Sequence, residues 1–312
     1  MKALRLLILF ALAAVPVAAA APTPAAPTRS SADCSITSTG LVPLTDLTGK
    51  RTYRGQRGGL YPGGVNRPPR WYLNAGLAAA KRIRPIDGQV ALLSIGMSNA
   101  TQEFTPFIRL ADQDPQLSPA VTLVDGAMGG WDARRIARPA AGYWRAVDRR
   151  LLAAGTSPRA VQAVWLKTAI SGEERVFPDD ARALQTQLRA IVRILPQRFP
   201  SLRLIYMSSR TYGGYAITPV NPEPVAYESG YAVRWLIQDR MQERLRGPWI
   251  GWGPYLWTDG EKGRADGLTW TCPDVKQDGM HPSPLGSAKV ARALLRFFKT
   301  DATSKSWFAP TP

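Results

Sequence analysis

From residue 89 onward the chain alternates short apolar runs with longer amphipathic stretches, and this alternation limits the folds open to it. Short aliphatic runs are typical of strands buried on both faces of a sheet. We expect strands at 90–95, 120–124, 161–165, 202–207 and 249–253, and helices at 100–110, 143–154, 180–195, 231–244 and 286–298. Strands that alternate with helices connect by right-handed crossovers, so the sequence predicts a three-layer α/β/α sandwich around a parallel sheet.

The first 33 residues do not share this pattern. Lys2 and Arg5 precede an apolar run at 6–15, and the alanines at 18–20 are typical of a cleavage site. We expect a secretory signal over 1–20, because the run is too short to span a bilayer comfortably. An uncleaved anchor is the alternative. Residues 21–33 read as a flexible lead-in. No later run is apolar for long enough to cross a membrane, so the mature protein is expected to be secreted or periplasmic.

Residues 34–88 are predicted to form an ordered extension packed on the main domain, which spans 89–312. The extension is rich in turn-forming residues, and its centre at 53–64 has too many glycines for a helix or a long strand. A phosphate-binding loop is the alternative, but no Lys-Ser/Thr pair follows the glycines.

The two cysteines, Cys34 and Cys272, are expected to form a disulfide because an even pair in an oxidising compartment usually does. The formal net charge is +17, which suits contact with anionic envelope polymers. The arginines are scattered and no nucleic-acid module is recognisable, so we expect no nucleic-acid partner.

Ser98 follows a predicted strand and a glycine turn, and a predicted helix begins just after it. This position places a hydroxyl at the carboxyl edge of the sheet and at a helix N-terminus, where open α/β sheets carry their chemistry. Simple capping of the helix by Ser98 is the alternative.

His281 is the only histidine of the chain, and Asp278 precedes it by three residues. A carboxylate at this spacing can orient an imidazole, which gives the base and its orienting group in a hydrolytic triad. A solvated aspartate beside a lone histidine is the alternative. This chemistry requires no metal or other cofactor, and one histidine with two paired cysteines would offer few ligands for a metal ion.

Together, Gly-Met-Ser-Asn at 96–99 and Asp-Gly-Met-His at 278–281 resemble the first and last blocks of the SGNH (GDSL-like) hydrolase superfamily. The resemblance covers about 89–298 and implies a flavodoxin-like fold and a Ser98–His281–Asp278 triad. The first block is similar to that of carbohydrate esterases such as sialate and xylan acetylesterases. In the superfamily the oxyanion is bound by backbone and side-chain N–H groups, and the residues that match these donors here are Ser98, Gly130 and Asn99. One of the family's donors is the backbone N–H of a glycine in the second block. Gly130 matches that glycine best and Gly129 next.

The third block departs from the family, because Lys167 stands in the region where the superfamily usually presents an asparagine or a Trp-His-Gln-Gly-Glu run. Lys167 could bind the oxyanion from the end of its strand, or it could be a structural lysine. The resemblance implies a secreted serine esterase that removes O-acyl, typically acetyl, groups from a carbohydrate. Two alternatives stay open: a non-catalytic glycan- or envelope-binding protein on the same fold, and a lipid or short-chain carboxylesterase. Six aromatic residues could stack on sugars or serve the core: Trp131, Tyr212, Tyr215, Trp252, Trp257 and Trp270.

Overall fold

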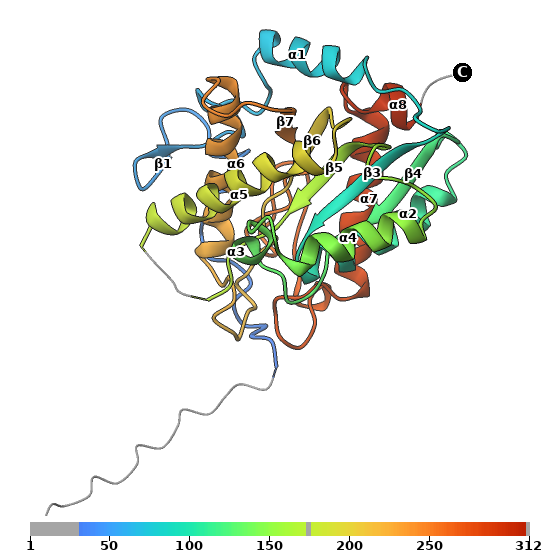
Figure 1. The fold of residues 1–312 in the computed structure, drawn as a ribbon. Coiled ribbons are helices and arrows are strands. Elements are labelled where there is room, and N and C mark those ends of the chain that lie inside the picture. Colours follow the sequence, from blue (N-terminus) through green and yellow to red (C-terminus); the bar gives the residue numbers. More distant parts are fainter. Residues whose placement is uncertain (1–30, 173–175, 310–312) are drawn as a thin grey trace, which may run out of the picture.

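The computed structural model describes residues 31–172 and 176–309. Its centre is a five-stranded sheet in the order β4-β3-β5-β6-β7, with every pair parallel (Figure 1). The strands are β3 (Val90–Gly96), β4 (Val121–Asp125), β5 (Val161–Lys167), β6 (Leu204–Met207) and β7 (Trp249–Trp252). Numbered along the chain, this order is 2-1-3-4-5, the flavodoxin-like arrangement. The predicted fold class is confirmed.

Helices cover both faces of the sheet, and in Figure 1 α5 lies in front of it and α7 behind. One face carries α2 (Ser98–Asp112), α7 (Pro284–Thr300) and α1 (Arg70–Ala80), and the other carries α4 (Gly142–Ala153), α5 (Asp179–Arg198) and α6 (Val225–Met241). Aromatic contacts hold the first layer together: Phe104 of α2 stacks on Trp165 of β5, and Tyr206 of β6 contacts Phe298 of α7. Short elements complete the chain: β1 (Thr52–Tyr53), β2 (Gln56–Arg57), α3 (Ala133–Ile136), the 3₁₀ turn η1 (Cys272–Asp274) and α8 (Lys305–Phe308).

The strands agree closely with the sequence prediction because every residue of β3, β5, β6 and β7 is buried. Helix α6 agrees less well, since it begins at Val225, six residues before the predicted start at Tyr231. Nearly every residue of α6 is buried, including Glu228 and Gly230, so the segment lacks the two-faced pattern that marks a surface helix.

The extension contains a helix that the sequence analysis did not predict. Helix α1 follows Pro69 and is rich in alanine, a strong helix former. Its Tyr72 donates a hydrogen bond to the Ile250 carbonyl of β7 at 2.7 Å, and Trp249 Nε1 donates back to the Tyr72 carbonyl at 3.0 Å. Glycine-rich turns dominate the rest, with only the two-residue strands β1 and β2, as expected of 53–64.

Residues 33–41, which we call the N-terminal strap, lie along the segment that precedes α7. The predicted disulfide is present and joins Cys34 to Cys272. Asp259 accepts hydrogen bonds from the Thr39 amide at 2.7 Å, the Gly40 amide at 3.1 Å and the Ser38 hydroxyl at 2.6 Å. The expected signal at 1–20 and all but the last three residues of the lead-in lie outside the described residues. In the described part of the chain, no helix has the length and apolarity to cross a membrane.

Candidate active site

Ser98 is positioned by the tight connection between β3 and α2. Gly96 closes the strand against β5, where a Cβ on residue 96 would lie only 2.1 Å from the Lys167 carbonyl oxygen. A side chain therefore cannot be accommodated there without moving the backbone. Met97 occupies the N-cap position of α2, so Ser98 lies in the first helical turn. Its hydroxyl turns toward His281.

The three predicted triad residues form a continuous chain of hydrogen bonds. Ser98 Oγ lies 2.7 Å from His281 Nε2, and His281 Nδ1 lies 2.5 Å from Asp278 Oδ2. With the ring proton on Nδ1 and facing the carboxylate, Nε2 is left free to accept the serine proton. The side chains of His281 and Asp278 are 23% and 33% exposed, so a substrate can reach them from solvent.

Asp278 also organises its own loop. Its Oδ1 accepts from the amides of Met280 at 3.0 Å and His281 at 2.9 Å. Partial burial opposes ionisation of this carboxyl, but the hydrogen bonds from His281 and Met280 outweigh it and hold its pKa below the usual value. The carboxylate is therefore ionised at neutral pH, as an orienting group for an imidazole must be.

Two contacts fix this loop against the rest of the molecule. Asn99 Nδ2 donates to the Met280 carbonyl at 2.9 Å, which ties the loop to α2. Gly279 has φ +68°, and a Cβ there would lie 1.7 Å from the Tyr215 carbonyl oxygen, so only glycine fits. The side-chain amide of Asn99, predicted as an oxyanion donor, is thus engaged with Met280 in this structure.

The loop after β4 lies beside the nucleophile. The Met128 amide donates to the Gly96 carbonyl at 3.1 Å, and a Cβ built on Gly129 would lie 3.8 Å from the Ser98 Cβ. Gly130 follows with φ +76°, and its carbonyl accepts from Arg135 at 2.7 Å. Gly129 therefore lies beside Ser98, and the Gly130 amide is one residue further along the same loop.

Lys167 is buried beneath α2 and paired with Glu103, a residue that sequence reasoning did not single out. Its Nζ binds both carboxylate oxygens of Glu103, and its side chain is 1% exposed. Burial lowers the pKa of Lys167 to about 8, opposed by Glu103 and assisted by the like charge of Arg210. Glu103 lies four residues after Asn99, on the buried face of α2. An acidic residue on that face was the feature of the sequence that could have pointed to the pair.

Arg210 and Glu223 are two further ionisable residues that the sequence analysis missed. Arg210, after β6, is 3% exposed, and burial lowers its pKa although Glu103, Glu223 and Asp278 act in the opposite direction. Glu223 accepts from the Gly213 amide at 2.7 Å, Trp257 Nε1 at 2.7 Å and the Tyr227 amide at 3.0 Å. Burial nevertheless raises the pKa of Glu223 to about 7.

Five of the six aromatic residues considered for sugar stacking are buried, with Tyr212, Tyr215, Trp252, Trp257 and Trp270 at most 5% exposed. They belong to the core. Only Trp131 is partly exposed, and it directly follows Gly130.

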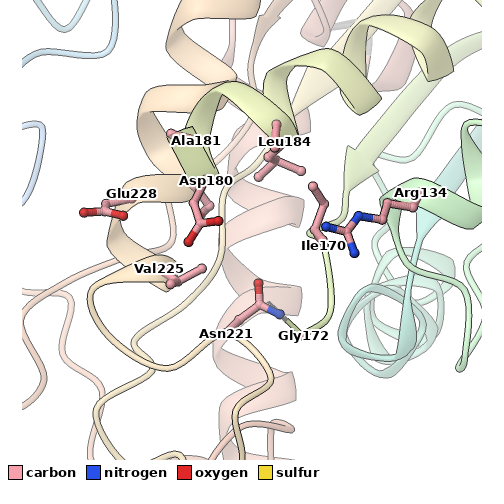
Figure 2. Close-up of a pocket in the computed structure, with 11 residues that line it drawn as sticks. Arg134, Ile170, Gly172, Asp180, Ala181, Leu184, Asn221, Val225 and Glu228 are labelled. Atoms are coloured by element: carbon pink, nitrogen blue, oxygen red, sulfur yellow. The ribbon is translucent and has the colours of Figure 1, made fainter. Parts of the chain in front are cut away.

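A small cavity of mixed polar and apolar lining lies where α5 and α6 begin (Figure 2). The side chains of Asp180 and Asn221 point into it, whereas Glu228 points away. Across the described ranges, no three His, Cys, Asp or Glu side chains gather closely enough to hold a metal ion.

Several solved structures resemble this chain in fold. A GDSL-like lipase from Bacteroides thetaiotaomicron matches with a TM-score of 0.39 and 7% identity, covering 72% of this chain and 95% of that one. The periplasmic domain of a lipopolysaccharide acetyltransferase from Salmonella ser. Paratyphi A matches at 0.38 and 12%, covering 72% and 94%. A carbohydrate esterase, described as having divergent catalytic and non-catalytic binding functions, matches at 0.36 and 11%, covering 68% and 69%.

No family model matches the chain, and no curated protein matches it. The solved structures are likenesses of fold at low identity. One of them, the GDSL-like lipase, is named for the superfamily that the sequence motifs resemble.

Proposed function

We propose that the protein is a serine esterase that hydrolyses O-acyl esters, with acetyl esters on a carbohydrate as its substrates. The observation that carries the proposal is the hydrogen-bonded chain from Ser98 through His281 to Asp278, with spacings of 2.7 and 2.5 Å. Hydrogen bonds of this length connect a nucleophile, a base and an orienting carboxylate in the order that acyl transfer needs.

In the proposed mechanism, Ser98 Oγ attacks the ester carbonyl and its proton passes to His281 Nε2. The tetrahedral intermediate collapses when the imidazolium returns that proton to the leaving alcohol, which leaves an acyl-serine. Water, deprotonated by the same imidazole, then releases the acid and regenerates Ser98. Asp278 holds the ring in position and stabilises its charged form in both halves of the reaction.

The oxyanion would be bound by backbone N–H groups of Ser98 and of the Gly129–Gly130 turn. Ser98 begins α2, so the positive end of the helix dipole favours negative charge at this point. Lys167 and Asn99 would have to leave Glu103 and the Met280 carbonyl, respectively, to donate directly. Lys167 remains a proposed donor, and its contribution can be measured separately from its role in the ion pair.

A carbohydrate substrate is favoured by the resemblance of residues 96–99 to carbohydrate esterases and by Trp131. The partly exposed indole of Trp131 adjoins the Gly130 turn, where a sugar ring could stack beside the reacting ester. The disulfide between Cys34 and Cys272 supports export, because such bonds persist in oxidising compartments.

Hydrolysis of p-nitrophenyl acetate by purified protein, compared with Ser98→Ala, tests the proposal. Wild type should turn over and be labelled by a fluorophosphonate probe, and Ser98→Ala should do neither. Equal labelling of the two proteins would remove Ser98 as nucleophile. Glycan binding without turnover would favour the non-catalytic alternative, and a strong preference for long acyl chains would favour a lipid esterase.

A further inference from the structure

A groove between α2 and α7 begins beside the triad and continues along the two helices. Its near part is lined by Thr101, Gln102, Thr105, Pro106, Arg109, Lys276, Pro282, Pro284 and Ser287. Its far part shares Pro106 and Arg109 with the near part and adds Leu110, Gln113, Ala288, Ala291 and Arg292. The two parts therefore form one continuous depression.

The near end of the groove is lined by residues that adjoin the triad in sequence. Pro282 directly follows His281, and Thr101 lies one helical turn after Ser98. From Thr101 to Arg109 the groove follows eight residues of α2, which corresponds to roughly 12 Å at the rise of an α-helix. A polymer whose ester is held at Ser98 could therefore continue along this path.

The charged side chains that line the groove are all basic, although the Asp125 carboxylate accepts hydrogen bonds from two hydroxyls of the lining. Lys276, Arg109 and Arg292 are exposed in its lining, and no Asp or Glu of the described residues belongs to that lining. Neither Arg109 nor Arg292 forms an ion pair with any residue in the described ranges. Lys276 Nζ donates to Gln102 Oε1 at 3.2 Å, a neutral partner that leaves its charge uncompensated.

The groove also carries groups that suit hydroxyls. Pro106 lies inside α2 and lacks an N–H, so the Gln102 carbonyl has no helical donor at this position. The hydroxyls of Thr101 and Thr105 donate to Asp125, which holds them in place within the lining.

The two arginines of the groove suit acid groups, because a guanidinium matches the geometry of a carboxylate with two parallel hydrogen bonds.

The geometry points to an O-acylated anionic polysaccharide as the substrate, bound along the α2–α7 groove with its ester at Ser98. This inference rests on the proposed esterase function and specifies its substrate class. Lys276 lies nearest the triad in sequence, Arg109 lies further along α2, and Arg292 lies across from it on α7. Acid groups repeated along the polymer would meet these cations in turn.

The test compares kcat/KM on acetylated polygalacturonate, on acetylated neutral xylan and on p-nitrophenyl acetate. Wild type should prefer the anionic polymer over xylan, and added salt should reduce that preference by screening. Each of Arg109→Gln, Lys276→Gln and Arg292→Gln should lower the ratio of kcat/KM for polygalacturonate to that for p-nitrophenyl acetate by about two- to fivefold, as for exposed ion pairs. The triple variant should lower it by about tenfold or more.

Arg193→Gln is the matched control, because Arg193 is an exposed arginine on α5, on the opposite face of the sheet. It should leave the ratio unchanged. An unchanged ratio in the triple variant, or an equal loss in Arg193→Gln, would overturn the inference. Calorimetric binding of unacylated polygalacturonate to Ser98→Ala, with and without the triple substitution, tests the groove without turnover. Absence of hydrolysis on all three substrates would therefore count against the esterase, while loss of this binding in the triple variant would still support the groove.

Discussion

The nucleophile and its acid–base partners stand on two different kinds of structure. Ser98 lies between β3, in which every residue is buried, and the 15-residue helix α2. Asp278 and His281 lie between β7 and α7, where the 3₁₀ turn η1 is the one helical or strand element. Sheet and helix packing fixes the position of Ser98, whereas Asp278 and His281 depend on contacts between their loop and other parts of the chain.

The holding contacts come from distant parts of the chain. The N-terminal strap binds Asp259 and is joined to Cys272 by the disulfide. Asn99 of α2 binds the Met280 carbonyl. The Ile217 amide donates to the Asp278 carbonyl at 3.3 Å. The segment that leads to the base is thus tied to the extension through Asp259 and Cys272, although the extension contributes no triad residue.

The largest effect is expected from Asp278→Asn. Asparagine can still accept from the Met280 and His281 amides through its carbonyl oxygen, so the loop should keep its shape. The amide cannot stabilise the imidazolium or keep the ring proton on Nδ1, so kcat should fall by about 10⁴-fold. Steady-state kinetics measures this, with circular dichroism to confirm folding. A decrease of less than tenfold would separate Asp278 from the chemistry.

Lys167 tests whether the sheet-and-helix part of the site, which positions Ser98, also contributes a positive charge to catalysis. If Lys167 acts on the oxyanion, Lys167→Ala should lower kcat by about 10²–10³-fold with little change in KM. Lys167→Asn, which introduces the amide donor usual in the superfamily that the sequence motifs resemble, should recover part of that loss.

A second variant separates this role from the ion pair. Lys167→Ala alone leaves Glu103 buried without its partner, which costs about 3–5 kcal/mol of folding stability. Replacing both residues, as Lys167→Met with Glu103→Leu, should recover much of that stability by urea unfolding. If the double variant is stable and retains full kcat, the lysine has a structural role only.

The same contrast explains what sequence could predict. The strands and the Asp278–His281 pair depend on local patterns: a run of apolar residues, or a spacing of three. The Lys167–Glu103 pair joins residues 64 positions apart, and the contacts of Asp259 with the strap span about 220. Helix α1 was missed because glycine-rich turns surround it. Long-range pairings of this kind leave no periodic trace in the sequence.

Removal of the disulfide should loosen the segment that carries Asp278 and His281 and leave the position of Ser98 unchanged. Cys34→Ser with Cys272→Ser should lower the free energy of unfolding by about 2–4 kcal/mol, since the bond closes a long loop. kcat on p-nitrophenyl acetate should fall as the loop that carries His281 loosens, and fluorophosphonate labelling should slow with it. Unchanged stability and kcat would show that the remaining strap contacts suffice.

The smallest effect concerns Glu223, which ties the loop after β6 through Gly213, Tyr227 and Trp257. Burial raises the pKa of its carboxyl from 4.5 to about 7 on folding, so between these values the folded state holds a proton that the unfolded state has lost. The stability contributed by this group is therefore full below about pH 4.5 and is lost as the pH rises through about 7.

Glu223→Gln cannot titrate but retains an acceptor for the Gly213 amide and Trp257 Nε1. Urea unfolding at pH 5 and pH 8 should show that wild type loses more stability than Glu223→Gln across this interval, by on the order of 2 kcal/mol. Other groups titrate equally in both proteins, so the difference between the two pH dependences isolates this carboxyl. Parallel pH dependences would mean that the three N–H donors keep Glu223 ionised in the folded protein. The loop after β6 would then be anchored by a charge rather than by a neutral acid.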